Sequence, residues 1–227
     1  MAAGTEASAI DYFWNGHPLR RFASAVSFRA RKGMFATFMR ELVPAPDCTI
    51  VDVGVTPERA SREANFFEAL YPYKHKLTAT SIEDASYLES EYPGVRFVQT
   101  DGDRLPFGDK AFDVVVSFAV LEHVGDRERQ RRFLAELMRV GRRLFLTTPN
   151  RWHPIEFHTI VPFIHWLPQK LHQAILRRIG LRVWAETSAL NLVTKKDIAG
   201  LLPANSGARI ESHKLFGIPS NLIVIID

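Results

Sequence analysis

The sequence predicts an α/β protein: a mostly parallel sheet of seven strands with helices on both faces and an antiparallel last strand. Two observations favour this class. Short, nearly continuous apolar runs alternate with amphipathic segments, which is typical of parallel strands that are covered on both faces and joined by right-handed crossovers. Two further apolar runs then close the chain with a short turn between them, as in an antiparallel pair.

The expected elements begin with a helix over Arg20 to Leu42, where apolar residues recur at helical spacing. We expect this helix to pack beside the sheet. Five apolar runs that indicate strands follow it, namely TIVDV, KLTATS, VRFVQT, FDVVVSF and RRLFLTT. Between them lie three segments that indicate helices, namely ASREANFFEALY, EDASYLESEY and RERQRRFLAELMRV.

The carboxy-terminal part departs from this alternation. Residues 149–193 are rich in aromatic, proline and basic residues, and we expect their first part, 149–181, to form a largely helical lid. A helix should then open at Thr194, with Asp197 three residues on as a variant of the capping box. The last two strands, ARIESHKLF and SNLIVIID, are expected to be joined through GIPS.

Composition indicates one soluble globular domain over residues 1–227, with a helical segment over 1–46 and an insertion over 149–193. The chain is 46% hydrophobic and 24% charged, which suits a single substantial core. The start, MAAGTEASAIDYF, has no signal-peptide pattern, and no stretch is long enough for a membrane span, so we expect a cytoplasmic protein. The only cysteine, Cys48, excludes an internal disulfide framework and indicates a small buried apolar residue.

The net charge of +4 is spread along the chain. No nucleic-acid-binding motif accompanies it, so we expect solvated helix faces and no nucleic-acid partner.

Polar residues follow each predicted strand. Because ligands of open α/β sheets bind beyond the carboxyl ends of the strands, these positions are candidates for a site. They are Asp52 and Gly54; Ser81 to Asp84; Asp101 to Asp103; Ser117 to His123; and Thr147 to Asn150.

This series resembles the class I S-adenosylmethionine-dependent methyltransferases, which have a Rossmann-like fold, and in particular the small-molecule, type 11-like members. The strongest match is VQTDGDRLPFGDKAFDVVVSFAVLEHV, Val98 to Val124. The resemblance implies S-adenosylmethionine as the cofactor and methyl transfer to oxygen or nitrogen of a small-molecule or lipid- or glycan-linked acceptor. It also implies these cofactor-binding residues: Asp52, Gly54, Glu58, Glu83, Asp101, Gly102, Asp103 and Ser117.

Several of these roles follow the family pattern residue by residue. Gly54 is implied to let the backbone approach the methionine part of the cofactor. Asp101 is implied to accept a hydrogen bond from the adenine amino group, with Gly102 and Asp103 shaping the turn; these three are also common turn formers. The acid that commonly binds the ribose is replaced by Ser81. Glu83 or Asp84 is close enough to substitute, and Ser81 is equally consistent with a helix cap.

The loop after the first strand departs further from the family, because its usual glycines are missing. Thr56, Pro57 and Glu58 indicate a helix start, with Thr as the cap and Pro at the first position. The methionine end of the cofactor carries an ammonium group, which Asp52 and Glu58 could attract. It also carries a carboxylate, for which Arg59 or Arg62 is suitable.

Methyl transfer to a hydroxyl needs a group that takes its proton, and His123 in LEHV is the candidate catalytic base. A packing role for His123 is equally consistent with the sequence. Residues after the fifth strand are expected to bind the acceptor, namely Asn150, His153, Glu156 and His158. The spacing of the histidines matches no established metal pattern, so we expect no metal ion.

Two other functions remain open at this point. One is an inactive methyltransferase-fold binding subunit, which the rebuilt loop and Ser81 would suit. The other is a nucleic-acid methyltransferase, whose usual acceptor motif is absent after the fourth strand. The basic amphipathic stretch TIVPFIHWLPQKLHQAILRRIG suits a lid and is also compatible with peripheral membrane contact. The sequence makes no prediction of oligomeric state.

Overall fold

A seven-stranded sheet forms the centre of the part of the chain that the computed structural model describes, residues 20–59, 61 and 63–227. The N-terminal part of the predicted helical segment, residues 1–19, lies outside these ranges. The strand order is β3-β2-β1-β4-β5-β7-β6. The strands are β1 (Ile50–Val53), β2 (Leu77–Ser81), β3 (Arg96–Gln99), β4 (Phe112–Phe118), β5 (Gly141–Pro149), β6 (Arg209–Leu215) and β7 (Ile218–Ile226).

Strand β7 runs antiparallel to both of its neighbours, β5 and β6, whereas the pairs among β1 to β5 are parallel. The predicted sheet and its antiparallel last strand are therefore confirmed. The chain order reverses at β1, which pairs with β2 on one side and β4 on the other. The carboxyl ends of these three strands meet there, which is the position where open α/β sheets bind ligands.

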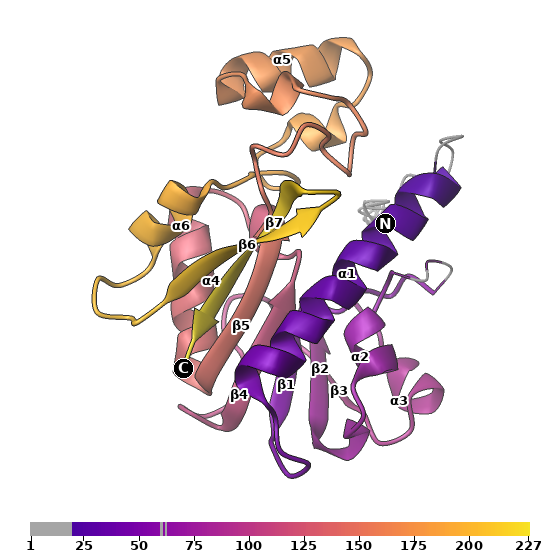
Figure 1. Ribbon diagram of the computed structural model, residues 1–227, viewed down its shortest axis with the longest axis vertical. Coiled ribbons are helices and arrows are strands. Elements are labelled where there is room, and N and C mark those ends of the chain that lie inside the picture. Colours follow the sequence, from indigo (N-terminus) through magenta and orange to yellow (C-terminus); the bar gives the residue numbers. More distant parts are fainter. Residues whose placement is uncertain (1–19, 60, 62) are drawn as a thin grey trace, which may run out of the picture.

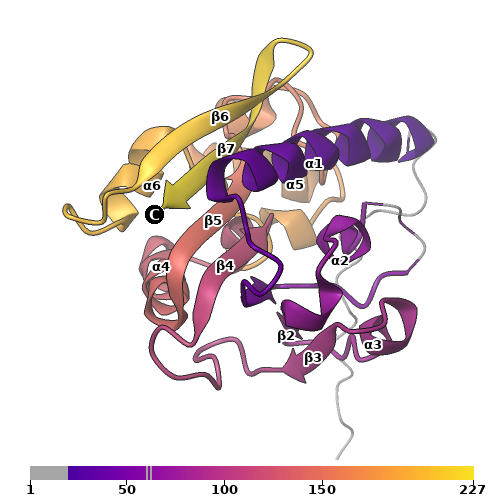
Figure 2. The same cartoon turned by 60° about the horizontal axis from the view of Figure 1, so that its bottom comes forward.

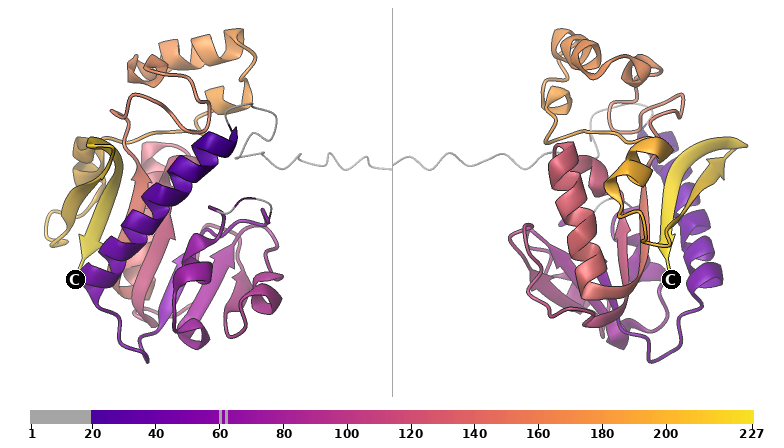
Figure 3. Two further views of the ribbon diagram at one scale, coloured as in Figure 1. Left: turned by 45° about the vertical axis from the view of Figure 1, so that its right-hand side comes forward. Right: turned by 90° about the vertical axis from the view of Figure 1, so that its left-hand side faces the viewer.

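Helices cover both faces of the sheet (Figures 1 and 3). On one face lie α1 (Arg20–Leu42), α2 (Phe66–Leu70) and α3 (Leu88–Glu91), and on the other lie α4 (Arg127–Val140) and α6 (Lys195–Leu201). Successive side chains of a strand point to opposite faces, so Ile50 joins the first cluster and Val51 the second. This alternation explains why the central strands β1, β4 and β5 are largely apolar on both faces.

Helix α1 is anchored by Phe38, which is completely buried. Its ring meets the rings of Phe67 on α2 and Phe145 on β5 in edge-on contacts, with centroids 5.1 and 5.4 Å apart. Edge-to-face packing of this kind adds to the free energy of burial. The predicted N-terminal helix therefore packs on the sheet as expected.

Two of the predicted helices begin at side-chain caps, and the cap at Thr194 is confirmed. Asp126 caps α4, its Oδ1 accepting from the backbone N–H of Arg129 at 2.9 Å. Thr194 and Asp197 form a complete capping box at the start of α6. Such caps involve neighbours in sequence and are therefore readable from it.

The helix predicted to start at Thr56 is wrong, because residues 54–59 are irregular and α2 begins only at Phe66. The turn predicted at GIPS is displaced as well. Phe216 and Gly217, both with positive φ, form a two-residue turn, and β7 already begins at Ile218 (Figure 2). Pro219 is tolerated within β7 because it lies at a register shift in the β6–β7 pairing.

The predicted lid, residues 149–181, is less helical than expected, and the whole insertion 149–193 is mostly irregular. It contains α5 (Gln169–Arg178) and the single turns η3 (Ile164–Trp166) and η4 (Val183–Ala185), joined by irregular chain. The helix α5 lies at the top of Figure 1, well apart from the sheet. This region has a small core of its own, made of Leu176, Trp184, Ala185, Leu190 and Leu192.

The remaining helical turns are η1 (Lys74–Lys76) and η2 (Leu121–His123). None of the described helices combines the length and apolar character needed to cross a bilayer.

Candidate functional site

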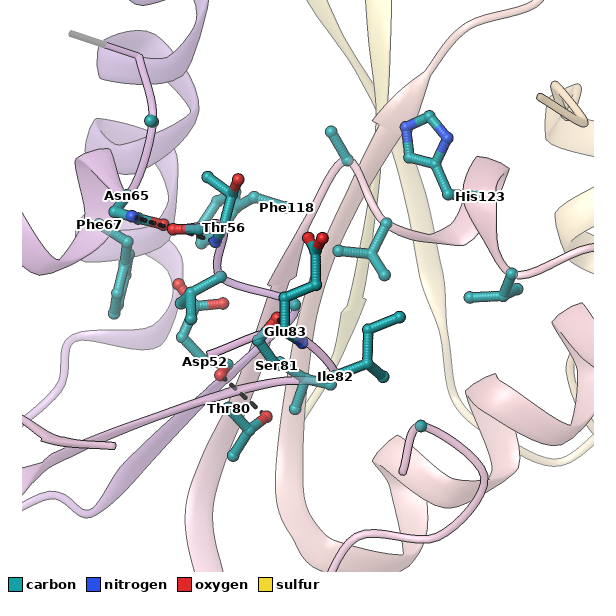
Figure 4. A pocket seen from close by; sticks show the side chains of 18 of the residues that line it. Asp52, Thr56, Asn65, Phe67, Thr80, Ser81, Ile82, Glu83, Phe118 and His123 are labelled. Atoms are coloured by element: carbon teal, nitrogen blue, oxygen red, sulfur yellow. Dashed lines mark hydrogen bonds between the residues drawn. The ribbon is translucent and has the colours of Figure 1, made fainter. Parts of the chain in front are cut away.

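A cavity of about 640 Å³ opens at the carboxyl ends of β1, β2 and β4 (Figure 4). Its volume lies within the range of roughly 300–1,000 Å³ that is common for small-molecule sites. Loops after four strands line it, together with α1, α2, α4 and residues 157–160. The predicted site residues found in its wall are Asp52, Gly54, Glu83, Asp101, Gly102, Asp103, His123 and His158.

At Gly54, the loop after β1 lines the cavity with backbone atoms and no side chain. Its φ of +102° favours glycine, and a Cβ built there would lie 2.3 Å from Cγ2 of Val120. The backbone N–H groups of Gly54 and Val55 both donate to the carbonyl of Thr80, at 2.8 and 3.1 Å. A side chain at position 54 would therefore strain the loop and crowd the cavity wall.

Side chains of Asn65 and Tyr87 fix the conformation of the same loop, which was predicted to start a helix. The Asn65 side chain accepts from Thr56 N at 2.9 Å and donates to Thr56 O at 2.7 Å. The Tyr87 hydroxyl lies 3.3 Å from Thr56 O and 3.2 Å from Glu58 O. The side chain of Glu58, predicted to bind the cofactor, is not among the residues that line the cavity.

Two buried carboxyl groups, those of Asp52 and Glu68, lie together in the cavity wall. Burial and then the neighbouring Glu68 carboxyl raise the pKa of Asp52 well above its usual value. Burial raises the pKa of Glu68 to about 7. Neither carboxylate oxygen of Glu68 has a hydrogen-bond partner among the described residues. The pair is therefore suited to a cationic group of a ligand.

Arg31 is the arginine that α1 contributes to the cavity. Its guanidinium donates to the backbone carbonyl of Glu63, and burial lowers its pKa. Arg59, one of the two predicted carboxylate ligands, instead pairs with Glu91 at 3.3 Å and lies over the ring of Tyr87. The other, Arg62, lies outside the described residues.

The loop after β2 presents Glu83 and Ile82 to the cavity (Figure 4). The hydroxyl of Ser81 accepts from Glu83 N at 3.2 Å, but no helix begins there, so its predicted role as a helix cap is wrong. Ile82 is 64% exposed and offers an apolar surface beside Glu83. Asp84, the other predicted acid, accepts from Ser86 N and does not line the cavity.

Asp101 closes the turn after β3. Its Oδ1 accepts from the backbone N–H groups of Asp103 and Arg104, at 3.1 and 3.3 Å. Gly102 has a φ of +82°, which suits this tight turn. The hydrogen bonds that the structure gives to the Asp101 side chain all use Oδ1, so Oδ2 is the oxygen that can serve a ligand.

His123 and His158 come from distant parts of the chain, yet their ring centroids are 4.8 Å apart. Burial lowers the pKa of His123 to about 3, so its ring is neutral at neutral pH. The carboxylate of Glu156 raises the pKa of His158 against the opposing effect of burial. His158 in turn helps to lower the pKa of Glu156 to about 2. Glu156 therefore orients His158 and does not itself line the cavity.

Three other predicted site residues lie away from the cavity. Ser117 is completely buried and donates to the carbonyl of Val53 at 2.8 Å, so its hydroxyl links two strands. The amide of Asn150 bonds to the backbone of Trp152 and Pro219. His153 lies 2.8 Å from the carbonyl of Ile155. These side chains stabilise the chain around the site.

Sequence reasoning missed Arg31, Asn65 and Glu68. Arg31 lies on a helix that precedes the sheet, and nothing local marks it as a cavity residue. Asn65 and Glu68 come shortly after the loop that follows β1. Because this loop lacks the usual glycines of the family, the residues next to it in sequence were candidates for fixing its conformation.

Comparisons with known proteins agree on one family. The family described as a methyltransferase domain matches residues 51–143. A probable S-adenosylmethionine-dependent methyltransferase of Mycobacterium tuberculosis is 32% identical over 109 residues, which cover 47% of this chain and 39% of that protein. A ubiquinone biosynthesis O-methyltransferase of Coxiella burnetii is 29% identical over 141 residues, covering 56% and 59%. The chain thus spans about half the length of the curated relatives that it matches.

Solved structures share the fold at low identity. A 1,6-didemethyltoxoflavin-N1-methyltransferase of Burkholderia thailandensis, solved with its substrate and S-adenosylhomocysteine, gives a TM-score of 0.56 at 15% identity and covers 92% of this chain and 89% of that one. A magnesium protoporphyrin IX methyltransferase of Synechocystis PCC 6803, solved with bound SAH, gives a TM-score of 0.55 at 13% identity and covers 92% of this chain and 87% of that one.

Proposed function

Because this chain belongs to the class I S-adenosylmethionine-dependent methyltransferases, we propose that it transfers a methyl group from S-adenosylmethionine to a hydroxyl of a small-molecule acceptor. The observation that carries the proposal is the cavity at the junction of β1, β2 and β4, in which bare backbone, buried acids and a neutral imidazole meet. The choice of oxygen is supported by the O-methyltransferase of Coxiella burnetii among its relatives.

The residues of the cavity fit the cofactor in three places. The space over Gly54, which a side chain would fill, accommodates the methionine part. Asp52 and Glu68, in place of the predicted Glu58, attract its ammonium group, and Arg31 attracts its carboxylate. Glu83 accepts from the ribose hydroxyls, Oδ2 of Asp101 from the adenine amino group, and Ile82 packs on the adenine.

When bound, S-adenosylmethionine supplies an activated methyl group, so that a C–O bond forms as the S–C bond breaks. The chain must align the acceptor, exclude water and receive the proton of its hydroxyl. His123 lines the cavity with its ring neutral, so the ring can accept a hydrogen bond from that hydroxyl and orient its oxygen. Its lowered pKa makes it a weak base until the acceptor is bound beside it. Phe157 and Ile160, from the insertion, supply apolar surface for the acceptor beside His158.

A lipid-linked acceptor is the finer proposal, supported by the surface of the insertion. Seven of its large apolar side chains are at least 39% exposed, and basic residues lie beside some of them on α5. The apolar residues are Trp152, Ile155, Phe163, Trp166, Leu171, Ile179 and Val183. An apolar surface with a basic border suits the interface of an anionic membrane. Sedimentation with anionic and with neutral lipid vesicles tests this: binding to neither limits the acceptor to soluble molecules.

Calorimetric titration of the ligand-free chain with S-adenosylmethionine tests the proposed function. Asp101→Asn keeps Oδ1 for the turn but replaces Oδ2 by an amide that cannot accept, so binding should weaken by about 1–3 kcal/mol. Asp47→Ala, which changes an exposed aspartate before β1 at the opposite end of the sheet, should bind as the parent does. A folded chain that shows no binding at millimolar cofactor would favour the inactive binding subunit.

A further inference from the structure

We propose that the chain binds one divalent transition-metal ion of the zinc(II) class through Glu122, His123 and His158. Each residue offers one ligand atom, and the three atoms lie within 4.8 Å of one another. Glu122 and His123 belong to the turn η2 after β4, whereas His158 comes from the insertion. Both histidines line the cavity, so the ion would border the acceptor.

The hydrogen bonds that the two histidines make through Nδ1 assign the ligating role to Nε2 of each ring. Nδ1 of His123 lies 2.6 Å from the carbonyl oxygen of Ala189, which can only accept, so Nδ1 carries the hydrogen. Nδ1 of His158 lies 2.6 Å from Oε1 of Glu156 and donates in the same way. In the neutral form of each ring, Nε2 is then an acceptor, as metal ligation requires.

Glu122 supplies the third acceptor. Its side chain is completely buried, and Oε2 accepts from the hydroxyl of Thr148 at 2.9 Å. Oε1 has no hydrogen-bond partner within the described ranges and lies 3.8 Å from Nε2 of His123. Oε1 of Glu122 and Nε2 of the neutral His123 ring are thus two buried acceptors that face one another and repel. A cation between them would remove the repulsion and the cost of the unpaired oxygen.

The surroundings match those of metal sites. Glu156, His158 and the ion would form the carboxylate–histidine–metal series that fixes ring orientation in many metalloproteins. Arg31 brings one positive charge near the cluster. The negative charges of Glu63 and Glu122 lie close enough to favour its charged form. With the carboxylate of Glu156 included, the acids outnumber Arg31 and favour a divalent ion.

The donor set selects the class of metal. Two imidazole nitrogens and one carboxylate oxygen suit zinc(II) and its neighbours in the first transition row, and hard ions such as magnesium prefer oxygen alone. Zinc–ligand bonds of about 2.0–2.2 Å place ligand atoms ~3.4 Å apart, so binding would contract the cluster slightly. Three protein ligands leave one position open. If the proposed methyl transfer is correct, an acceptor hydroxyl in that position would lose its proton more easily.

Metal binding can be measured without cofactor or acceptor. The chain is stripped with a chelator, dialysed against cobalt(II) as a spectroscopic substitute and then against zinc(II), and its metal content is determined. We expect one ion per chain and the visible absorption of a low-coordinate cobalt(II) site. Glu122→Gln and His158→Ala should each weaken binding at least a hundredfold, and Glu156→Gln about 10–100-fold. His75→Ala, which changes an exposed histidine on η1, should bind as the parent does.

The parent chain alone can overturn the inference. A folded parent that retains no metal would mean that a proton on His158 relieves the repulsion instead. Equal binding by the parent and a folded His158→Ala chain would also overturn it. Since no cofactor is present, these results are independent of methyl transfer. An active enzyme whose folded chain binds no metal would refute the metal site and keep the proposed function.

Discussion

The side-chain amide of Asn65 exchanges two hydrogen bonds with the backbone of Thr56, accepting at 2.9 Å and donating at 2.7 Å. Asn65 itself has a φ of 48°, which asparagine tolerates better than most residues. The two hydrogen bonds resemble the pair that two opposite residues of an antiparallel sheet exchange. It fixes the loop after β1, where the sequence lacks the glycines of the related methyltransferases.

Asn65→Ala should therefore loosen this loop. The loss of the paired hydrogen bonds should lower the free energy of unfolding by about 1–3 kcal/mol and weaken S-adenosylmethionine binding. Denaturant unfolding and calorimetric titration measure the two effects. Asn205→Ala, in the exposed loop before β6, is the matched control and should change neither. Unchanged cofactor binding by Asn65→Ala would show that the pairing does not shape the site.

Gly54→Ala should abolish cofactor binding. The new Cβ would occupy a backbone conformation with a φ of +102° and lie 2.3 Å from Cγ2 of Val120. Such strain costs about 1–3 kcal/mol, which thermal unfolding would register. Adding Val120→Ala should recover part of the stability by removing the clash but not the strained φ. At Gly108 a Cβ would meet no atom within 4 Å, so Gly108→Ala is the control, and equal effects at both glycines would contradict the explanation.

Glu68 should make stability depend on pH. Because its folded pKa is about 7 and its usual value is 4.5, the folded chain holds a proton that the unfolded chain releases. The free energy of unfolding should therefore fall as pH rises from about 4.5 to 7, by about 3 kcal/mol.

Urea unfolding across this pH range measures the slope. Glu68→Gln should reduce it, and Asp52, whose raised pKa acts in the same direction, should keep part of it. Glu128→Gln, whose exposed side chain lies on α4, should keep it. If the free energy of unfolding of Glu68→Gln falls with pH as steeply as that of the parent, other titrating groups cause the pH dependence.

His123→Ala should lower turnover by roughly two to four powers of ten, with little change in cofactor affinity. The acceptor hydroxyl would lose the imidazole that takes its proton or helps to hold a metal ion beside it. Single-turnover rates with radiolabelled cofactor measure the effect, and His75→Ala is the control. If the rate with His123→Ala equals that of the parent, His123 serves packing alone.

The sequence by itself determined the sheet, its antiparallel last strand and the residues at the strand ends. Periodicity and capping are local properties, so the course of β1 to β5, the helix over Arg127–Val140 and the capping box at Thr194 could all be predicted. Because parallel strands end at one edge of the sheet, Gly54, Glu83 and Asp101 could be expected to lie together, and all three line the cavity.

Only the tertiary structure decided what fills the rest of the site. Asn65 and Glu68 shape the region where a helix start was predicted. A side chain that bonds to the backbone of a loop produces no periodic pattern in the sequence, so these roles could not be predicted. Arg31 reaches the cavity from a helix outside the sheet, and His158 reaches Glu122 from an insertion. Contacts between such distant segments depend on how the helices and the insertion pack. Apolar patterns in the sequence indicate which faces of these elements are buried, but they do not indicate which polar residues meet there.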